Sequence, residues 1–312
     1  MKKYEFTGET KEYGEITLKR IKRIGDGLRG GWIEKESNLS QDGSCFVYDN
    51  ATVYDNATVY GDAGVYDNAG VYGNAEIGGC ARACDNVEIY GNAVIFKNAK
   101  VCDNAEIYGN AVIFENAKVY GNAEVYGDAK VYGDAEIHGH AEVYGRARIY
   151  DSVEIYGDAK AYGNAVVYGN AEAWGDAKIY ESARVYDSAR IRQNARVHGD
   201  VTIYNDAEIC GNARVCGDAR VYGSAKVYGD AILKGGIHIG EIVVECDKVL
   251  YVQCTQRTMT LYLKDGVTYC NIGCQKDMTY EDLLKRIEED GGMKPHRQEY
   301  INIMKCSKIL LG

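Results

Sequence analysis

Proline is nearly absent from this chain: a single one, Pro295, occurs in 312 residues. A strand ladder that uses every backbone N–H excludes proline, so the sequence before residue 295 permits uninterrupted strand pairing. Long apolar runs are also missing, and no stretch approaches the roughly 18 residues that a membrane-spanning helix needs. No apolar segment follows Lys2 and Lys3, so we expect no signal peptide and predict a cytoplasmic location.

An excess of positive charge is absent too. Lys and Arg number 36 against 46 Asp and Glu, which gives a formal charge of −10. Because phosphate binding needs clustered cations, we expect neither nucleic acid nor an anionic membrane as a partner. In the cytoplasm the 11 cysteines are expected to be mostly reduced. We expect no metal and no cofactor.

The abundant residues are glycine and tyrosine, with 37 and 27 copies, and they belong to a repeat. Stepping by six from Val47 to Val227 gives 31 hexads without insertion or deletion. The first position is Val or Ile in 28 hexads, the fifth is Ala in 28, and the second is Tyr in 20. A fixed period of this kind predicts a solenoid.

The spacing within a hexad predicts how the coil closes. Ala and the following Val or Ile are two residues apart, so they point to one side of a short strand, while the variable residue and the aromatic point to the other. The Gly/Asp–Asn/Asp pair tolerates positive φ and forms a corner. Three hexads then close a triangular coil with an aliphatic interior, and about ten such coils stack in parallel.

This pattern resembles the hexapeptide repeat of left-handed parallel β-helices, a family with many acyl- and acetyltransferases. The resemblance implies left-handed winding, and for an enzyme it implies a histidine base, an acyl-CoA donor and a homotrimer. One departure is that these enzymes commonly have Gly after the aliphatic residue, where this chain has mostly Tyr.

Both ends depart from the hexads. Residues 1–46 contain short alternating segments and are predicted to be an N-terminal β cap, because the open end of a β-helix is an exposed sheet edge. The β-helix is predicted to span 47–232. Residues 233–312 are predicted to be a small α+β unit. Strands 259–263 and 267–272 flank a hairpin turn at Lys264-Asp265-Gly266. A helix capped by Thr279 runs to about Glu289 and stops at Gly291-Gly292, and a second helix runs from Pro295 to about Lys308.

The combination of the three parts resembles uncharacterised Tyr-rich hexapeptide-repeat proteins of bacteria and their prophages, often labelled acyltransferases or polymer-forming proteins. This resemblance implies a phage or prophage origin in a bacterial host cell. It implies no established mechanism.

Because the register never slips, the outward positions can be arranged as three faces with rungs 18 residues apart. Face one carries an expected tyrosine ladder: Tyr54, Tyr72, Tyr90, Tyr108, Tyr126, Tyr144, Tyr162 and Tyr180. Beside it runs a charged strip of four acidic and then four basic residues: Glu88, Glu106, Glu124, Glu142, Lys160, Lys178, Arg196 and Arg214. The strip suits a partner or antiparallel self-association, and the alternative is a set of solvated charges with no role.

Face two holds the most apolar outward residues, which we name the face-two patch: Val94, Phe96, Val112, Phe114, Tyr132 and Tyr150. We predict that it binds a protein partner or another copy of the chain. The alternative is packing within the chain.

Face three is irregular, with Cys84, Cys102, Tyr120 and His138 on successive rungs. His138 and His140 are the weak candidates for a catalytic base. Cys84 and Cys102 stack closely enough for a disulfide or a shared metal, but reduced structural thiols are the favoured interpretation. The leading hypothesis is a non-enzymatic structural or protein-binding rod that forms a dimer or trimer. The alternative is a hexapeptide-type acyltransferase that uses an acyl-CoA donor.

Overall fold

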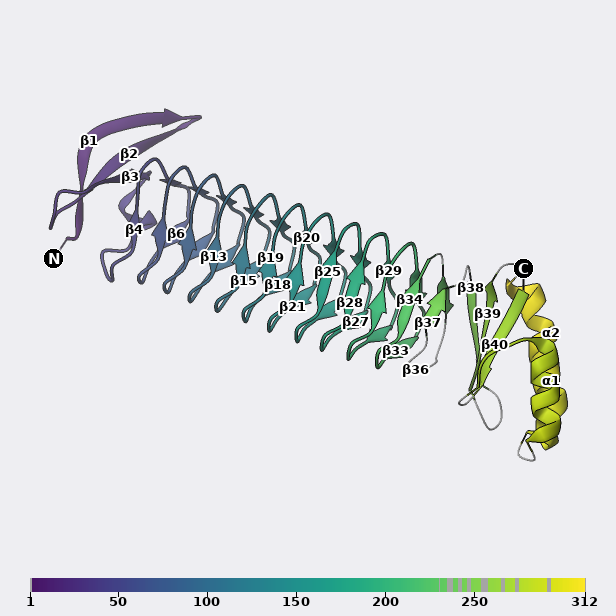
Figure 1. The fold of residues 1–312 in the computed structure, drawn as a ribbon. Coiled ribbons are helices and arrows are strands. Elements are labelled where there is room, and N and C mark those ends of the chain that lie inside the picture. Colours follow the sequence, from purple (N-terminus) through teal and green to yellow (C-terminus); the bar gives the residue numbers. More distant parts are fainter. Residues whose placement is uncertain are drawn as a thin grey trace. The chain divides into compact units, whose positions relative to one another are not determined.

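The structure is a computed structural model. It describes residues 2–229, 231–234, 238–240, 243–245, 248–253, 258–264, 267–272, 275–290 and 293–311. The chain divides into two compact units, Met1–Asn170 and Ala171–Gly312, and each is a stack of coils extended by a terminal element (Figure 1).

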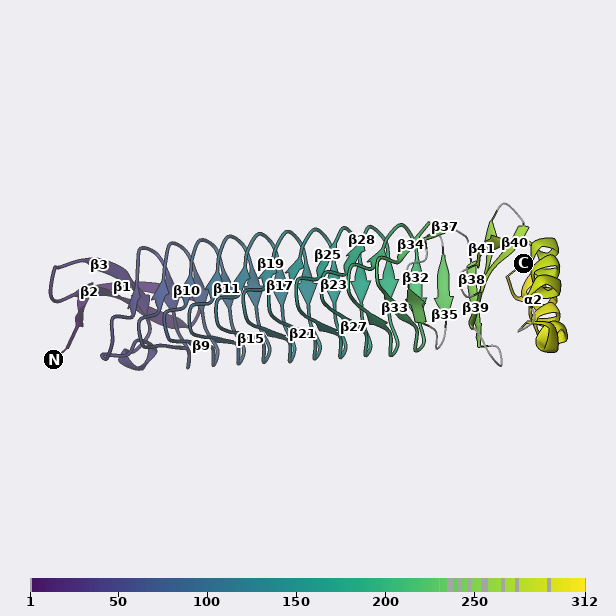
Figure 2. The same cartoon turned by 60° about the horizontal axis from the view of Figure 1, so that its bottom comes forward.

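In the first unit each coil contributes one short strand to each of three parallel sheets (Figures 1 and 2). The sheet under face one contains β5 (Thr52–Val53), β8 (Gly70–Val71), β11 (Glu88–Ile89), β14 (Glu106–Ile107), β17 (Glu124–Val125), β20 (Glu142–Val143) and β23 (Lys160–Ala161). The sheet under face two contains β6 (Thr58–Val59), β9 (Glu76–Ile77), β12 (Val94–Ile95), β15 (Val112–Ile113), β18 (Lys130–Val131), β21 (Arg148–Ile149) and β24 (Val166–Val167). The sheet under face three contains β4 (Phe46–Val47), β7 (Gly64–Val65), β10 (Arg82–Ala83), β13 (Lys100–Val101), β16 (Lys118–Val119), β19 (Glu136–Ile137) and β22 (Glu154–Ile155).

The interior is aliphatic, as the hexads predict. Ala51 and Val53 are fully buried, whereas Thr52 and Tyr54 between and after them face outward and stay partly exposed. The same alternation repeats along the stack. An all-β parallel solenoid is therefore confirmed, and its left-handed winding stays a prediction.

Backbone hydrogen bonds join each coil to the next at a constant offset. Thr52 N donates to Ala69 O at 2.9 Å, and Tyr54 N donates to Val71 O at 3.1 Å. Consecutive strands pair in register 18 residues apart, so Glu88 lies beside Glu106. At the corners asparagine amides form a parallel ladder, in which Asn74 Nδ2 donates to Asn92 Oδ1 at 3.0 Å.

The first corner residue of the hexad has positive φ, which explains its Gly and Asp content. Where this residue is acidic, its carboxylate accepts the corner N–H of the next coil: Asp85 Oδ2 accepts from Asp103 N at 3.2 Å, and Asp103 Oδ2 accepts from Gly121 N at 2.9 Å. Glu115 has φ of 64° and accepts from Gly133 N in the same way at 3.0 Å. The side-chain carboxylate therefore accepts from a backbone N–H that has no partner among the strand hydrogen bonds.

The N-terminal segment covers the first coil. The strands β1 (Tyr4–Tyr13) and β2 (Ile16–Arg23) form an antiparallel hairpin, and β3 (Arg29–Ile33) joins β2 to β5. The short helix η1 (Glu36–Asn38) follows. Asn38 is fully buried, and its Nδ2 donates to Asp55 O and Ala57 O at 3.0 and 2.9 Å. The Tyr4 hydroxyl donates to Leu39 O at 3.0 Å, and burial raises the Tyr4 pKa to about 12.

The second unit continues the coil pattern with longer strands. Face one is formed over β26 (Lys178–Ile179), β29 (Arg196–Val197), β32 (Arg214–Cys216) and β35 (Ile232–Lys234). Face two is formed over β27 (Arg184–Val185), β30 (Thr202–Ile203), β33 (Arg220–Tyr222) and β36 (His238–Gly240). Face three is formed over β25 (Glu172–Trp174), β28 (Arg190–Arg192), β31 (Glu208–Ile209), β34 (Lys226–Tyr228) and β37 (Val243–Glu245). Parallel pairing therefore reaches Glu245, beyond the residue 232 at which the hexads end.

The C-terminal part of this unit is α+β. An antiparallel sheet of β38 (Lys248–Gln253), β39 (Thr258–Lys264), β40 (Val267–Ile272) and β41 (Gln275–Met278) is followed by α1 (Tyr280–Glu289), η2 (Lys294–His296) and α2 (Arg297–Leu311). Leu261, Leu283 and Tyr300 are fully buried together in its core. Thr279 Oγ1 accepts from Asp282 N, so the predicted helix start is confirmed. Lys264, the first residue of the predicted turn, is the last residue of β39, and the other turn residues, Asp265-Gly266, and Gly291-Gly292 lie outside the described residues. Neither α1 nor α2 is long and apolar enough to cross a membrane.

We predict that a glycine corner is replaced better by aspartate than by alanine. Gly109 has φ of +72°, and an added Cβ would lie 2.8 Å from Gly127 N. Gly109→Ala should lower the free energy of unfolding by about 1–2 kcal/mol, because a left-handed conformation is unfavourable for alanine. Gly109→Asp should cost less, because the new carboxylate can accept the Gly127 N–H. Urea denaturation of both variants checks this, and equal losses would contradict the capping role of the acidic corners.

Candidate functional site

The face-two patch is a flat aromatic surface with valines beside it. The Phe96 and Phe114 rings stack with centroids 6.0 Å apart and an interplanar angle of 12°. Val94 and Val112 are paired neighbours on the same face, and both are partly exposed. Nearby rungs continue with Tyr132 stacked on Tyr150, whose centroids are 5.0 Å apart.

Two local features shape this patch. At the Gly78 rung the aromatic is missing, and the Tyr60 ring leans into the space, so that a Cβ on Gly78 would lie 2.4 Å from it. The Lys97 ammonium lies 4.4 Å from the centre of the Phe114 ring and 3.4 Å from Glu115 Oε1. The patch is therefore apolar in its centre and charged at its corner.

Face one carries the predicted tyrosine ladder in the first unit. Rings from Tyr54 to Tyr162 stack with centroids 4.7–5.0 Å apart and interplanar angles of 1–4°. Tyr13 on the tip of the N-terminal hairpin lies against the first rung, with its ring centre 5.5 Å from that of Tyr54. In the second unit, Tyr180 stacks on His198.

The acidic half of the charged strip lies beside this ladder, and the hydroxyls of the ladder contact it. Tyr108 donates to Glu124 Oε2 at 3.2 Å, and Tyr126 donates to Glu142 Oε2 at 3.4 Å. Lys160 forms an ion pair with Glu142. Burial, and then Glu142, raises the Tyr126 pKa to about 12, so this hydroxyl remains a donor at neutral pH.

In the second unit, three basic residues of the strip lie beside one another on paired strands. Lys178 pairs with Arg196, and Arg196 pairs with Arg214. These three side chains therefore form a row of like charge, just as Glu88, Glu106 and Glu124 do in the first unit.

The two candidate histidines occupy different environments. The His138 ring is part of the face-three stack, between Tyr120 and Tyr156 at 4.7 and 5.0 Å. His140 lies exposed on the next corner, where its backbone N–H donates to Gly157 O at 2.8 Å. Their catalytic role stays a prediction.

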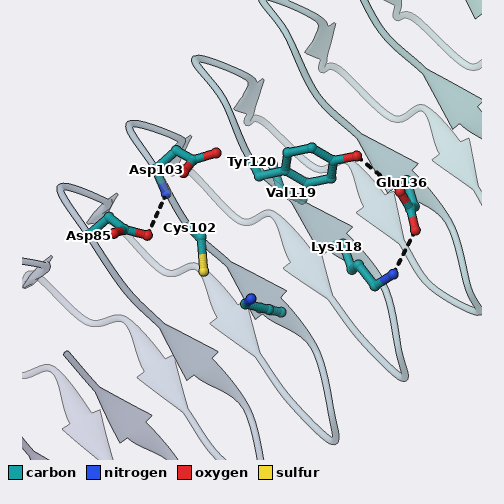
Figure 3. Close-up of a pocket in the computed structure, with 8 residues that line it drawn as sticks. Asp85, Cys102, Asp103, Lys118, Val119, Tyr120 and Glu136 are labelled. Atoms are coloured by element: carbon teal, nitrogen blue, oxygen red, sulfur yellow. Dashed lines mark hydrogen bonds and ion pairs between the residues drawn. The ribbon is translucent and has the colours of Figure 1, made fainter. Parts of the chain in front are cut away.

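Face three contains a hollow of about 410 Å³ beside this stack (Figure 3). Its lining comes from corners, strands and the first ring of the stack: Asp85, Lys100, Cys102, Asp103, Lys118, Val119, Tyr120 and Glu136. The hollow exists because the rungs before Tyr120 carry small cysteines in place of rings. Sequence reasoning noted these cysteines but did not predict a cavity, although two successive rungs without an aromatic were a usable signal.

One wall of the hollow is a fixed polar group. Glu136 accepts from Lys118 Nζ at 2.7 Å and from the Tyr120 hydroxyl at 3.0 Å (Figure 3). The Lys118 hydrogen bond holds the pKa of Glu136 below its usual range, and burial raises the Tyr120 pKa to about 12. At neutral pH this wall is therefore an ion pair with a neutral phenol.

The opposite side contains sulfur. Cys84 and Cys102 form a disulfide, with their Cα atoms 4.7 Å apart. The expectation of reduced thiols is therefore wrong for this pair in the structure, because adjacent parallel rungs place two cysteines within the range of disulfide geometry. Among the described residues, Cys45, Cys80 and Cys210 are free thiols.

Comparison with known proteins agrees with this architecture. Residues 46–61, 53–67 and 213–229 match the family model described as the YdcK beta solenoid repeat. The chain is a β-solenoid repeat protein. No curated protein matches this solenoid.

We predict that the charged form of Glu88 lowers the free energy of unfolding, whereas the charged form of Glu136 raises it. Burial, and to a smaller extent Glu106, raises the Glu88 pKa, whereas Lys118 lowers that of Glu136. The Glu88 carboxylate therefore costs stability once the pH rises through its folded pKa. The Glu136 carboxylate stabilises the fold at pH values above about 4.3, the pKa of glutamate in the unfolded chain. This stabilisation is lost as the pH falls through the lower pKa that Glu136 has in the folded chain.

At pH 7, Glu88→Gln should leave the solenoid as stable or more stable, and Glu136→Gln should destabilise it, each by less than about 1 kcal/mol because both groups are partly solvated. Urea denaturation at pH 7 and about pH 4 checks this, and both differences should shrink at the lower pH. Effects of the same sign at pH 7 would contradict it.

Proposed function

We propose that the solenoid is a non-enzymatic structural protein whose face-two patch binds a protein partner, in the first instance a second copy of the chain. The observation that carries this proposal is the stacked Phe96–Phe114 pair beside the paired Val94 and Val112. A rigid sheet already holds these side chains in place, so binding orders few additional rotamers. Aromatic groups on such a surface contribute much of the energy of protein interfaces.

The charged strip supports self-association as a second contact. The first unit presents Glu88, Glu106 and Glu124 in a row, and the second unit presents Lys178, Arg196 and Arg214 in a row. We propose that the acidic row of one copy contacts the basic row of another, because complementary charge fixes the orientation of partners more than it adds affinity. We include in this proposal a dimer or trimer. We also include a cytoplasmic location, which rests on the lack of an apolar segment after Lys2 and Lys3, and a phage or prophage origin in a bacterial host, which rests on the sequence resemblance.

The prediction that tests face two removes the two phenylalanine rings. Phe96→Ser with Phe114→Ser should weaken self-association by at least about tenfold, because truncated interface aromatics typically cost more than 1 kcal/mol each. Light scattering across a concentration series should then give a smaller mass than for the wild type.

The matched control is Tyr48→Ser with Tyr66→Ser, which removes two stacked rings from neighbouring coils but on face three, where no self-association contact is proposed. This control should keep the wild-type mass. If both pairs of substitutions leave the mass unchanged, or both reduce it equally, the assignment to face two is wrong.

A further prediction separates this proposal from the acyltransferase alternative. Coenzyme A and acetyl-CoA should not raise the melting temperature of the solenoid, since His138 is stacked between tyrosines and His140 is exposed at a corner. Thermal unfolding with and without the two compounds measures this. A ligand-dependent rise that disappears in a His138→Ala and His140→Ala variant would overturn the non-enzymatic assignment.

A further inference from the structure

Cys84 and Cys102 lie at equivalent positions on neighbouring rungs of face three. They directly follow β10 and β13, where Arg82 pairs with Lys100 and Ala83 with Val101 in parallel register. Each cysteine therefore points outward at the position that holds an aromatic ring on other rungs. Cys102 retains 7% exposure at the margin of the hollow.

Asp85 adds a third donor to the two sulfurs. It follows Cys84 at the corner, where its φ of 65° turns the chain. One ligand atom from each of Cys84, Asp85 and Cys102 lies within 4.8 Å of the others. Asp85 Oδ2 accepts the N–H of Asp103, which orients the carboxylate and leaves Oδ1 available to a ligand.

A tetrahedral metal site needs a fourth ligand, and the hollow provides space for one. It opens directly against Cys102 and Asp85 (Figure 3), so a water molecule can occupy a fourth position. Two thiolates, one carboxylate and one water form a donor set that suits Zn²⁺, which binds sulfur and carboxylate oxygen in tetrahedral sites. Lys100 also lines the hollow and offsets the single negative charge that two thiolates, one carboxylate and a divalent cation leave.

We propose that Cys84, Asp85 and Cys102 form a redox-controlled binding site for a thiophilic divalent cation of the Zn²⁺ class. In the disulfide form the sulfurs are bonded to each other and the site is closed. A dithiol reductant delivers two electrons and two protons, which break the S–S bond and yield two thiols, while the reductant itself becomes a disulfide. Binding of the cation then releases both thiol protons.

The site is independent of the face-two patch, because it lies on another face and involves none of its residues. It also assigns a role to the missing rings, since an aromatic side chain at either cysteine position would occupy the space of the ligands.

The test measures metal bound to the full chain. After reduction with a phosphine and removal of excess reagent, Zn²⁺ bound per chain is counted by elemental analysis, and Co²⁺ is used as the spectroscopic probe. The reduced wild type should bind one more Zn²⁺ than a Cys84→Ser and Cys102→Ser variant, and should show a thiolate-to-Co²⁺ charge-transfer band that the variant lacks. Oxidised chain should bind no more than that variant.

Two matched controls locate the site. Asp85→Asn should weaken Co²⁺ binding at least tenfold, while Asp103→Asn, at the equivalent corner of the next coil, should leave it nearly unchanged. Asparagine tolerates the positive φ at both corners, so both variants should fold. Cys80→Ser, which removes an exposed thiol outside the cluster, should bind as the wild type does. Equal metal content in the reduced wild type and the double cysteine variant would overturn the proposal, as would equal losses from the two aspartate substitutions.

Discussion

The in-register pairing of each coil with the next is the constraint on which the rest of the structure depends. Since Thr52 N donates to Ala69 O, and the hexad strands after it repeat this offset, each side chain of the hexads lies above another from the same hexad position. A residue type that recurs every 18 positions must therefore stack on itself, whether this is favourable or not. Asparagine ladders and tyrosine stacks are favourable consequences, and the row of glutamates on face one is an unfavourable one.

Whether an outward glutamate stabilises the fold depends on its immediate neighbours. Glu136 lies beside Lys118 and under the Tyr120 hydroxyl, and its charged form is stabilised, whereas the neighbour of Glu88 along the strip is another glutamate and burial raises its pKa. The two residues occupy the same position in their hexads. Coil geometry alone therefore does not determine the sign of a charge's contribution. Selection for stability alone would favour alternating charges, and this is one reason for our proposal that the separate acidic and basic rows contact another molecule.

The hexad period predicts most of the solenoid because it specifies which side chains face inward. Val53 and Ala51 are buried and Tyr54 is outward as their spacing requires, and the three faces follow from the period of 18. The end of the coil stack was harder to predict. The strands β35, β36 and β37 pair in parallel and keep an aliphatic residue, Leu233, Ile239 and Val244, opposite the aliphatic residue of the preceding coil. Alanine precedes only the first of these residues at the usual spacing, and the last step between the strands is one residue shorter.

At the candidate site, too, the sequence predicts where the side chains lie but not how they are bonded. Spacing places Cys84 above Cys102, but it does not determine whether the sulfurs are bonded, and it does not show what happens when a ring is missing from a stack. At Gly78 the ring of Tyr60 leans into the vacant rung. At the two cysteine rungs a hollow is present, and the hydroxyl of Tyr120 is held on Glu136, directed along the stack and away from the cysteines. A missing ring therefore has different consequences at the two places, and the Lys118–Glu136–Tyr120 group anchors the ring that borders the hollow.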